Sequence, residues 1–142
     1  MISSFRDLEV WKRAHKLVLD VYGLTNMFPR GERFGMVSQI RRAAYSIPSN
    51  LAEGYGRRST NELLQFIAIA NGSAEELRYF LILSKALRYL SPEDEARLDG
   101  DITAIVQMLA ALSRSLKARK AANSRNTGHE SRITKSSVGV RA

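Results

Sequence analysis

Apolar residues recur at steps of three and four from Val10 to Leu116, and this spacing constrains the fold more than any other feature of the sequence. It places apolar side chains on one face of an α-helix, whereas a half-buried strand would need strict alternation, and no alternating run of useful length is present. The spacing predicts four helices, over about residues 6–27, 32–54, 59–89 and 92–117. Short connections between them predict an all-α, antiparallel up-down four-helix bundle.

Two serines and a proline support the predicted helix ends. Ser59 precedes Glu62 by three residues, which is the spacing of a capping box, and Ser91 precedes Pro92 and a run of acids. Pro48 stands inside the second helix, and because the apolar face resumes at Leu51, we expect a kink there rather than an end. The glycine in the middle of the third helix, Gly72, predicts the close approach of another helix at that level.

The fourth helix carries a heptad seam that ends near residue 117. The seam consists of Leu98, Ile102, Ile105, Leu109, Leu112 and Leu116. Beyond Lys120 the composition shifts to Ser, Asn, Thr, Gly, Arg and Lys without apolar period. We therefore predict one bundle domain, residues 1–117, and a basic, disordered tail, residues 118–142.

Most of the positive charge lies in the predicted tail. From Lys117 onward seven basic residues stand against Glu130 alone, so this segment carries +6 of the net charge of +8. The remaining chain carries only +2. A nucleic-acid surface predicted from charge alone would therefore lie mainly on the tail.

The stretch of residues 39–58 combines a polar stripe with two arginine pairs. At helical spacing, a row of residues would share one face and serve as a subunit contact or as internal polar packing: Gln39, Ser46, Asn50 and Glu53. Guanidinium groups bind phosphates or carboxylates in a bidentate manner. The residues predicted to bind nucleic acid or a protein partner are Arg41, Arg42, Arg57, Arg58, Lys117, Arg119 and Lys120.

Few residues in the chain suit catalysis or metal binding. There is no cysteine, and the two histidines, His15 and His129, lie on different segments. Gly54-Tyr-Gly56 lacks the preceding strand and following lysine of a phosphate-binding loop. We therefore predict no enzymatic activity, no metal, no cofactor and no small-molecule substrate.

The sequence also predicts where the protein resides. No run of 18 apolar residues is present, and the N-terminal sequence lacks the basic-then-apolar order of a signal peptide. We expect a cytoplasmic protein without a membrane segment.

Several of these stretches resemble the four-helix-bundle family of 23S rRNA intervening-sequence proteins, in the right order over about residues 5–116. The stretches are Phe5-Arg-Asp-Leu-Glu-Val-Trp-Lys-Arg-Ala14, Phe28-Pro-Arg-Gly-Glu32, Gln39-Ile-Arg-Arg-Ala-Ala-Tyr-Ser-Ile-Pro-Ser-Asn-Leu-Ala-Glu-Gly54, Arg57, and Ile69-Ala-Asn-Gly-Ser-Ala-Glu-Glu-Leu77. The resemblance implies a small bacterial bundle that forms a homopentameric ring and has no enzymatic activity. It also implies a relation to the accessory proteins of diversity-generating retroelements, which bind a reverse transcriptase and nucleic acid.

Two functional hypotheses follow. In the first, the protein is a non-enzymatic homo-oligomer that associates with RNA or a ribonucleoprotein through its arginines and basic tail. In the second, it is a protein-interaction adaptor, such as a reverse-transcriptase accessory protein, without direct nucleic-acid binding. In the second hypothesis the polar stripe makes subunit or partner contacts, and the tail only increases solubility.

Overall fold

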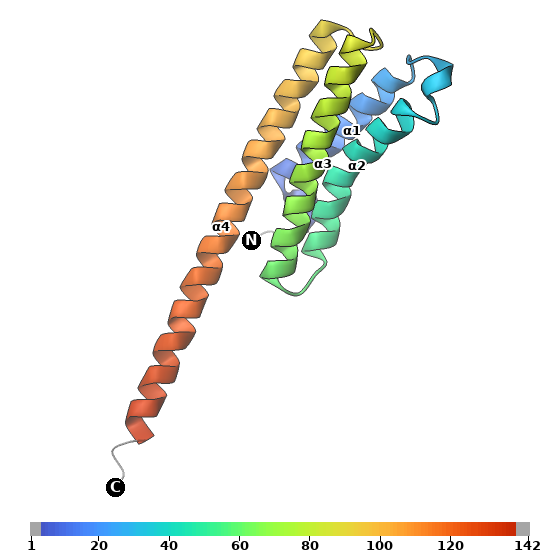
Figure 1. The fold of residues 1–142 in the computed structure, drawn as a ribbon. Helices are drawn as coiled ribbons and strands as arrows, with labels where there is room; N and C mark the ends of the chain where they lie inside the picture. The colour runs from blue at the N-terminus through green and yellow to red at the C-terminus, as the bar shows by residue number, and fades with distance from the viewer. Residues whose placement is uncertain (1–3, 139–142) are drawn as a thin grey trace.

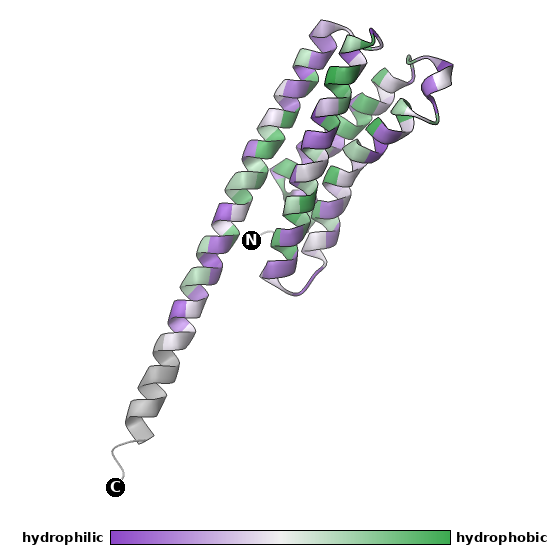
Figure 2. Cartoon of the chain, in the orientation of Figure 1, coloured by the Kyte–Doolittle hydropathy of each residue, from purple (hydrophilic) through white to green (hydrophobic). Residues whose placement is uncertain are grey.

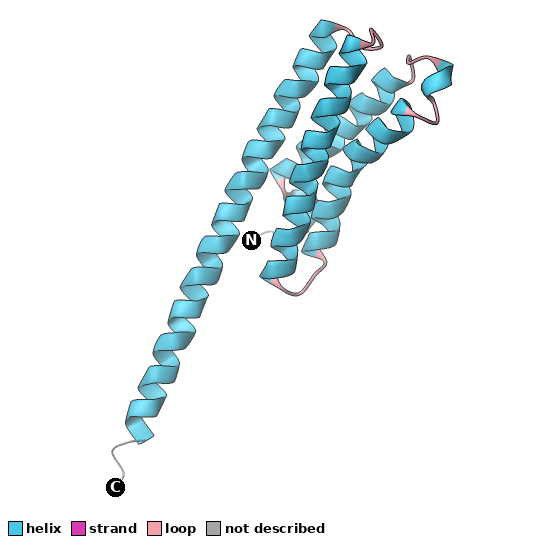
Figure 3. Cartoon of the chain, in the orientation of Figure 1, coloured by secondary structure: helices cyan, strands magenta, loops and turns pink. Residues whose placement is uncertain are grey.

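The computed structural model describes residues 4–138. Six helical elements follow one another: η1 (Phe5–Asp7), α1 (Glu9–Thr25), η2 (Arg30–Glu32), α2 (Met36–Tyr55), α3 (Thr60–Ala86) and α4 (Pro92–Val138). No strand occurs within residues 4–138 (Figures 1 and 3). The prediction of an all-α fold with four main helices is confirmed.

The four main helices surround one hydrophobic core. α1 packs against α2 and α4, and α3 packs against the same two helices. Figure 2 shows hydrophobic residues on the helices where they lie side by side. Each large buried apolar side chain contributes roughly 1.5–3 kcal/mol. The largest of them are Leu17, Ile40, Ile47, Leu51, Ile67, Leu77, Leu98, Ile102, Ile105 and Leu109.

Serine side chains cap α3 and α4 where the sequence predicts. The hydroxyl of Ser59 accepts a hydrogen bond from the backbone N–H of Glu62 at 3.1 Å, and the hydroxyl of Ser91 accepts one from Asp94 at 3.1 Å. Each bond satisfies one of the unpaired amides at a helix start.

The C-terminal end of α3 differs from the prediction, because the helix stops at Ala86 and not near Tyr89. Arg88 adopts φ 63°, and the N–H of Tyr89 donates to the carbonyl of Ser84 at 2.9 Å. The N–H of Arg88 donates to the carbonyl of Lys85 at 3.0 Å. This pattern is a Schellman motif with arginine in the position that glycine usually takes.

α2 continues through Pro48, which is buried, and ends at Tyr55 before Gly56. The close approach of helices lies at Gly54, where an added Cβ atom would be 2.8 Å from Phe66 Cβ and 3.0 Å from Leu63 Cδ1. The prediction of a close approach at Gly72 is wrong, because nothing lies within 4 Å of that position. Gly72 is exposed, so no neighbouring helix requires it there.

α4 does not end near residue 117 but runs to Val138, and it projects beyond the other helices (Figure 1). Residues 118–138 are therefore helical where the sequence predicts a disordered tail, and residues 139–142 lie outside the described residues. Leu116 is the last residue packed against the core, and residues 117–128 are all exposed. Residues 117–122 are alanine, lysine and arginine, which have high helix propensity, and extending a formed helix adds one hydrogen bond for each further residue fixed. An apolar period is therefore not needed for this extension.

Within the described residues, no helix is long and apolar enough to span a membrane.

Candidate nucleic-acid interface

Five of the predicted basic residues lie around one end of the bundle, where the turn between α2 and α3 faces α4. Lys120 Nζ hydrogen-bonds to Asn61 Oδ1 in the first turn of α3. Lys117 lies one helical turn before Lys120 and therefore on the same face of α4. All five side chains belong to exposed residues, and we refer to them together as the basic end: Arg57, Arg58, Lys117, Arg119 and Lys120.

The pKa of Tyr55 is affected by the charge of the basic end. Its partial burial raises the pKa of the phenol above its ordinary value of 10.0, while the positive charge of Arg119 lowers the pKa by a smaller amount. The influence of Arg119 on Tyr55 is a second indication that α4 passes close to the end of α2.

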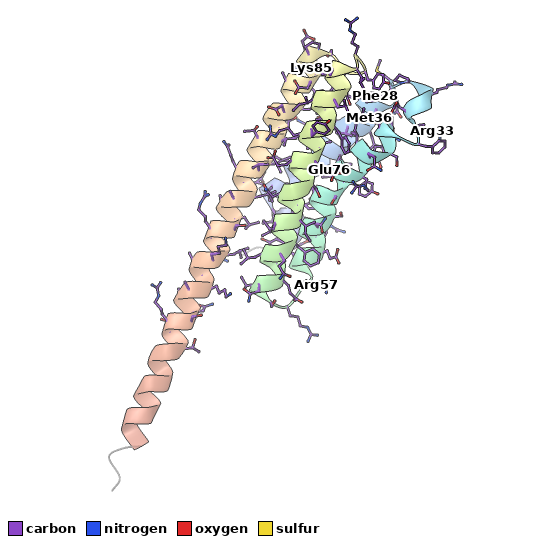
Figure 4. All side chains as sticks on the ribbon, viewed as in Figure 1. Phe28, Arg33, Met36, Arg57, Glu76 and Lys85 are labelled. Atoms are coloured by element: carbon purple, nitrogen blue, oxygen red, sulfur yellow. The ribbon has the colours of Figure 1, made fainter. Side chains whose placement is uncertain are left out.

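The two arginines of the turn differ in their contacts. Arg57 Nη2 donates to Glu53 Oε1 at 3.1 Å, and its guanidinium lies 5.1 Å from the centre of the Phe66 ring. Figure 4 shows Arg57 at the tip of the bundle beside this turn. Arg58 has no ion pair or side-chain hydrogen bond with any described residue. Arg58 therefore has all its donors available for a ligand.

Arg41 belongs to α2, far from the basic end, and its side chain contacts the C-terminal end of α1. Its Nε donates to Thr25 Oγ1 at 2.9 Å and its Nη2 donates to Asn26 Oδ1 at 2.9 Å. The same guanidinium lies 4.4 Å from the centre of the Tyr22 ring. Arg41 therefore joins α2 to the end of α1.

The polar stripe and the adjacent Arg42 make contacts within the chain, and two of these contacts join α2 to α3. Arg42 forms an ion pair with Glu76, which Figure 4 shows midway along α3. The hydroxyls of Ser46 and Ser73 lie 2.8 Å apart. The remaining members bond within α2: Asn50 Nδ2 donates to the Ser46 carbonyl at 2.7 Å, Gln39 Oε1 accepts from Arg42 at 3.2 Å, and Glu53 accepts from Arg57. A subunit contact by this stripe stays a prediction.

Sequence reasoning overlooked two arginines, Arg30 and Arg33. They lie in the connection between α1 and α2, which the sequence marks only as a turn around Pro29 and Gly31. Together with Arg41 they line a cavity at that end of the molecule. The sequence does contain a signal for them, because two arginines occur within four residues just before a helix start.

No group of three or more His, Cys, Asp and Glu side chains that could hold a metal ion comes together in residues 4–128. The His15 ring stacks on Trp11 with ring centres 5.2 Å apart and planes 9° from parallel. This contact gives His15 a packing role.

The chain is similar to known proteins in both sequence and fold. A family model described as 23S rRNA-intervening sequence protein matches residues 6–111. No curated protein matches the chain. The fold is similar to the crystal structure of a protein of unknown function from the S23 ribosomal protein family of Bacteroides thetaiotaomicron VPI-5482, with a TM-score of 0.66 and 24% sequence identity. That alignment covers 73% of this chain and 97% of the other, and at this identity it concerns the fold alone.

Proposed function

The chain belongs to the 23S rRNA-intervening sequence protein family, and from this premise we propose that it is a non-enzymatic, homo-oligomeric helical-bundle protein that associates with RNA or a ribonucleoprotein. The observation that carries the proposal is the basic end, where five exposed basic side chains from two segments gather around one turn. Phosphate oxygens accept hydrogen bonds from guanidinium and ammonium groups, and such contacts dominate the affinity of nucleic-acid binding.

Oligomerisation would strengthen this binding. One copy offers only a few phosphate contacts, whereas several linked copies raise the effective concentration of each remaining contact. We propose a homopentameric ring of bundles with antiparallel, up-down helices, as the family resemblance implies. The short connections of residues 56–59 and 87–91 support that topology.

Binding of a structured RNA across a salt series tests the proposal. We expect the full chain to bind at low salt, and the affinity to fall steeply as salt increases, because each phosphate contact releases counterions. Removal of residues 118–142 and the substitution Arg58→Gln should each weaken binding and flatten the salt dependence. Arg13→Gln, which removes the same charge from an exposed position on α1, serves as the control. The absence of low-salt binding by the full chain would exclude the proposal.

A second candidate function, a protein-interaction adaptor such as a reverse-transcriptase accessory protein, is favoured by an apolar groove on α1 and α2. The groove has a volume of about 280 Å³ and is lined by Phe5, Trp11, His15, Val18, Tyr45, Pro48, Ser49 and Ala52. Exposed aromatic and aliphatic surface of this kind suits a protein partner.

The substitution Tyr45→Glu separates the two functions, because Tyr45 is 46% exposed and lines this groove. Tyr79→Glu on α3, where the side chain is 58% exposed, is the matched control. The adaptor function would be favoured if Tyr45→Glu, but not Tyr79→Glu, reduces the oligomer mass in light scattering and if the unchanged chain shows no RNA binding. Loss of oligomer mass together with loss of RNA binding would favour the first proposal, since that proposal depends on linked copies.

A further inference from the structure

A cavity of about 240 Å³ lies in the connection between α1 and α2, at the opposite end of α2 from the basic end. Figure 4 shows Arg33 at this end, near Phe28 and Met36, and Arg57 at the other. α2 has 20 residues, so at 1.5 Å per residue roughly 30 Å separates the two ends. The cavity is lined by Thr25, Asn26, Phe28, Pro29, Arg30, Arg33, Val37 and Arg41.

Three of the lining residues are arginines, and none of them has a carboxylate partner among the described residues. Arg41 bonds only to neutral groups, namely the Thr25 hydroxyl, the Asn26 amide and the Tyr22 carbonyl. These bonds use Nε and Nη2 of Arg41, and its Nη1 has no hydrogen-bond partner in residues 4–128. Arg30 and Arg33 make no side-chain hydrogen bond within the same residues.

The three cavity arginines differ in this respect from the arginines that form ion pairs on the bundle surface. Four other arginines are each paired with an acid: Arg42, Arg57, Arg78 and Arg97. Arginines that line one cavity without a carboxylate between them repel one another, and a bound anion reduces that repulsion.

Glu32 is the one acidic residue in the segment 28–42, and its carboxylate is used elsewhere. Glu32 Oε2 accepts a hydrogen bond from the backbone N–H of Met36 at 3.1 Å, at the first residue of α2. The carboxylate therefore satisfies a helix-start amide and does not line the cavity.

We propose that this cavity binds a phosphoryl group. The three arginines that line it belong to two segments, η2 with its flanking residue and α2, so that their donors can meet a tetrahedral anion with oxygens in several directions. A phosphate carries about −1.5 to −2 charges at neutral pH and so balances three arginines better than a single carboxylate does. The volume lies below the roughly 300–1,000 Å³ of ligand pockets, so a phosphoryl group fits the site better than a whole nucleotide does.

The proposed site is separate from the basic end, so it can fail or succeed independently of the proposed RNA binding. Inorganic phosphate is the probe, titrated into the full-length protein and followed by backbone amide chemical shifts. We expect shifts centred on residues 25–41, and acetate at equal ionic strength should give much weaker shifts. Arg33→Gln should weaken phosphate binding by about tenfold, as expected for the loss of a charge-assisted hydrogen bond. Arg33 makes no described hydrogen bond, so this variant should keep the fold.

The substitution Arg13→Gln is the charge-matched control, since it removes one arginine from an exposed position on α1, outside both the cavity and the basic end, and should leave phosphate binding unchanged. Equal binding of acetate, an unchanged affinity of Arg33→Gln, or shifts centred on the basic end would overturn the proposal.

A further pair of probes identifies the source of the phosphoryl group. A short RNA with a 5′-phosphate is compared with the same RNA bearing a 5′-hydroxyl. Tighter binding of the phosphorylated RNA that Arg33→Gln abolishes would assign the site to a nucleic-acid end. Equal binding of the two RNAs, with phosphate binding retained, would assign it to a free phosphate compound.

Discussion

At the scale of single residues, Arg88 carries an unfavourable backbone conformation. Its φ of 63° lies in the left-handed region, where the Cβ atom crowds the following carbonyl oxygen. Glycine has no Cβ and adopts this conformation readily, which explains why it dominates this position of the Schellman motif.

We therefore expect Arg88→Gly to raise the free energy of unfolding by about 1 kcal/mol. Urea denaturation followed by circular dichroism measures the difference. Arg88→Ala removes the same side chain but keeps the Cβ atom, so it should give no such gain. Equal stabilisation by both variants would show that the effect comes from the removed charge.

Tyr55 links stability to pH at the alkaline end. Burial raises the pKa of its phenol above 10.0, so between the unfolded and the folded pKa the native state holds the proton more tightly than the unfolded state does. Stability then falls as pH rises above about 10. In Tyr55→Phe this contribution is absent, so its free energy of unfolding should fall less steeply than that of the unchanged protein over the same pH interval. Parallel curves for the two proteins would contradict the assignment.

At the scale of helices, Gly54 sets how closely α2 approaches α3. A methyl group there would lie 2.8 Å from Phe66 Cβ, so Gly54→Ala must force a shift and should cost about 1–3 kcal/mol. Gly72→Ala, in open space on α3, should instead stabilise the protein by up to about 1 kcal/mol through helix propensity. Thermal denaturation of the two variants should show a lower melting temperature for Gly54→Ala and a higher one for Gly72→Ala.

The helices that bury an apolar face are predictable from the sequence, since Val10 to Leu116 keep the helical period and two serines mark helix starts. The end of α3 is not predictable from the sequence, because Arg88 occupies the position where a glycine would have indicated the end of the helix. The extension of α4 has no buried face, so the apolar period contains no information about it.

The candidate sites are only partly predictable from the sequence, for a different reason. The arginine pairs are visible, but which of them are neutralised depends on contacts across helices, such as that of Arg42 with Glu76. The cavity of Arg30, Arg33 and Arg41 is formed by a connection whose path local spacing does not determine.

At the scale of the whole molecule, charge and packing are separated along α4. Up to Leu116 the helix packs against the core, and beyond it the described side chains are exposed and the acidic residues cease until Glu130. The bundle should therefore fold without residues 118–142, while the charge proposed to bind RNA lies largely on the projecting helix and the turn beside it.

Because the bundle and this basic segment share one uninterrupted helix, the angular phase of α4 decides which way its cations point. One alanine inserted between Leu116 and Lys117 would rotate Lys117, Arg119 and Lys120 by about 100° about the helix axis, with composition and charge otherwise unchanged. We expect this insertion to weaken RNA binding, while an alanine inserted after Gly128 should leave the affinity unchanged. Equal RNA affinities of the two insertion variants would mean that the segment attracts RNA through its net charge alone. A loss of affinity confined to the first insertion would mean that the helix holds its cations on the face that contacts RNA.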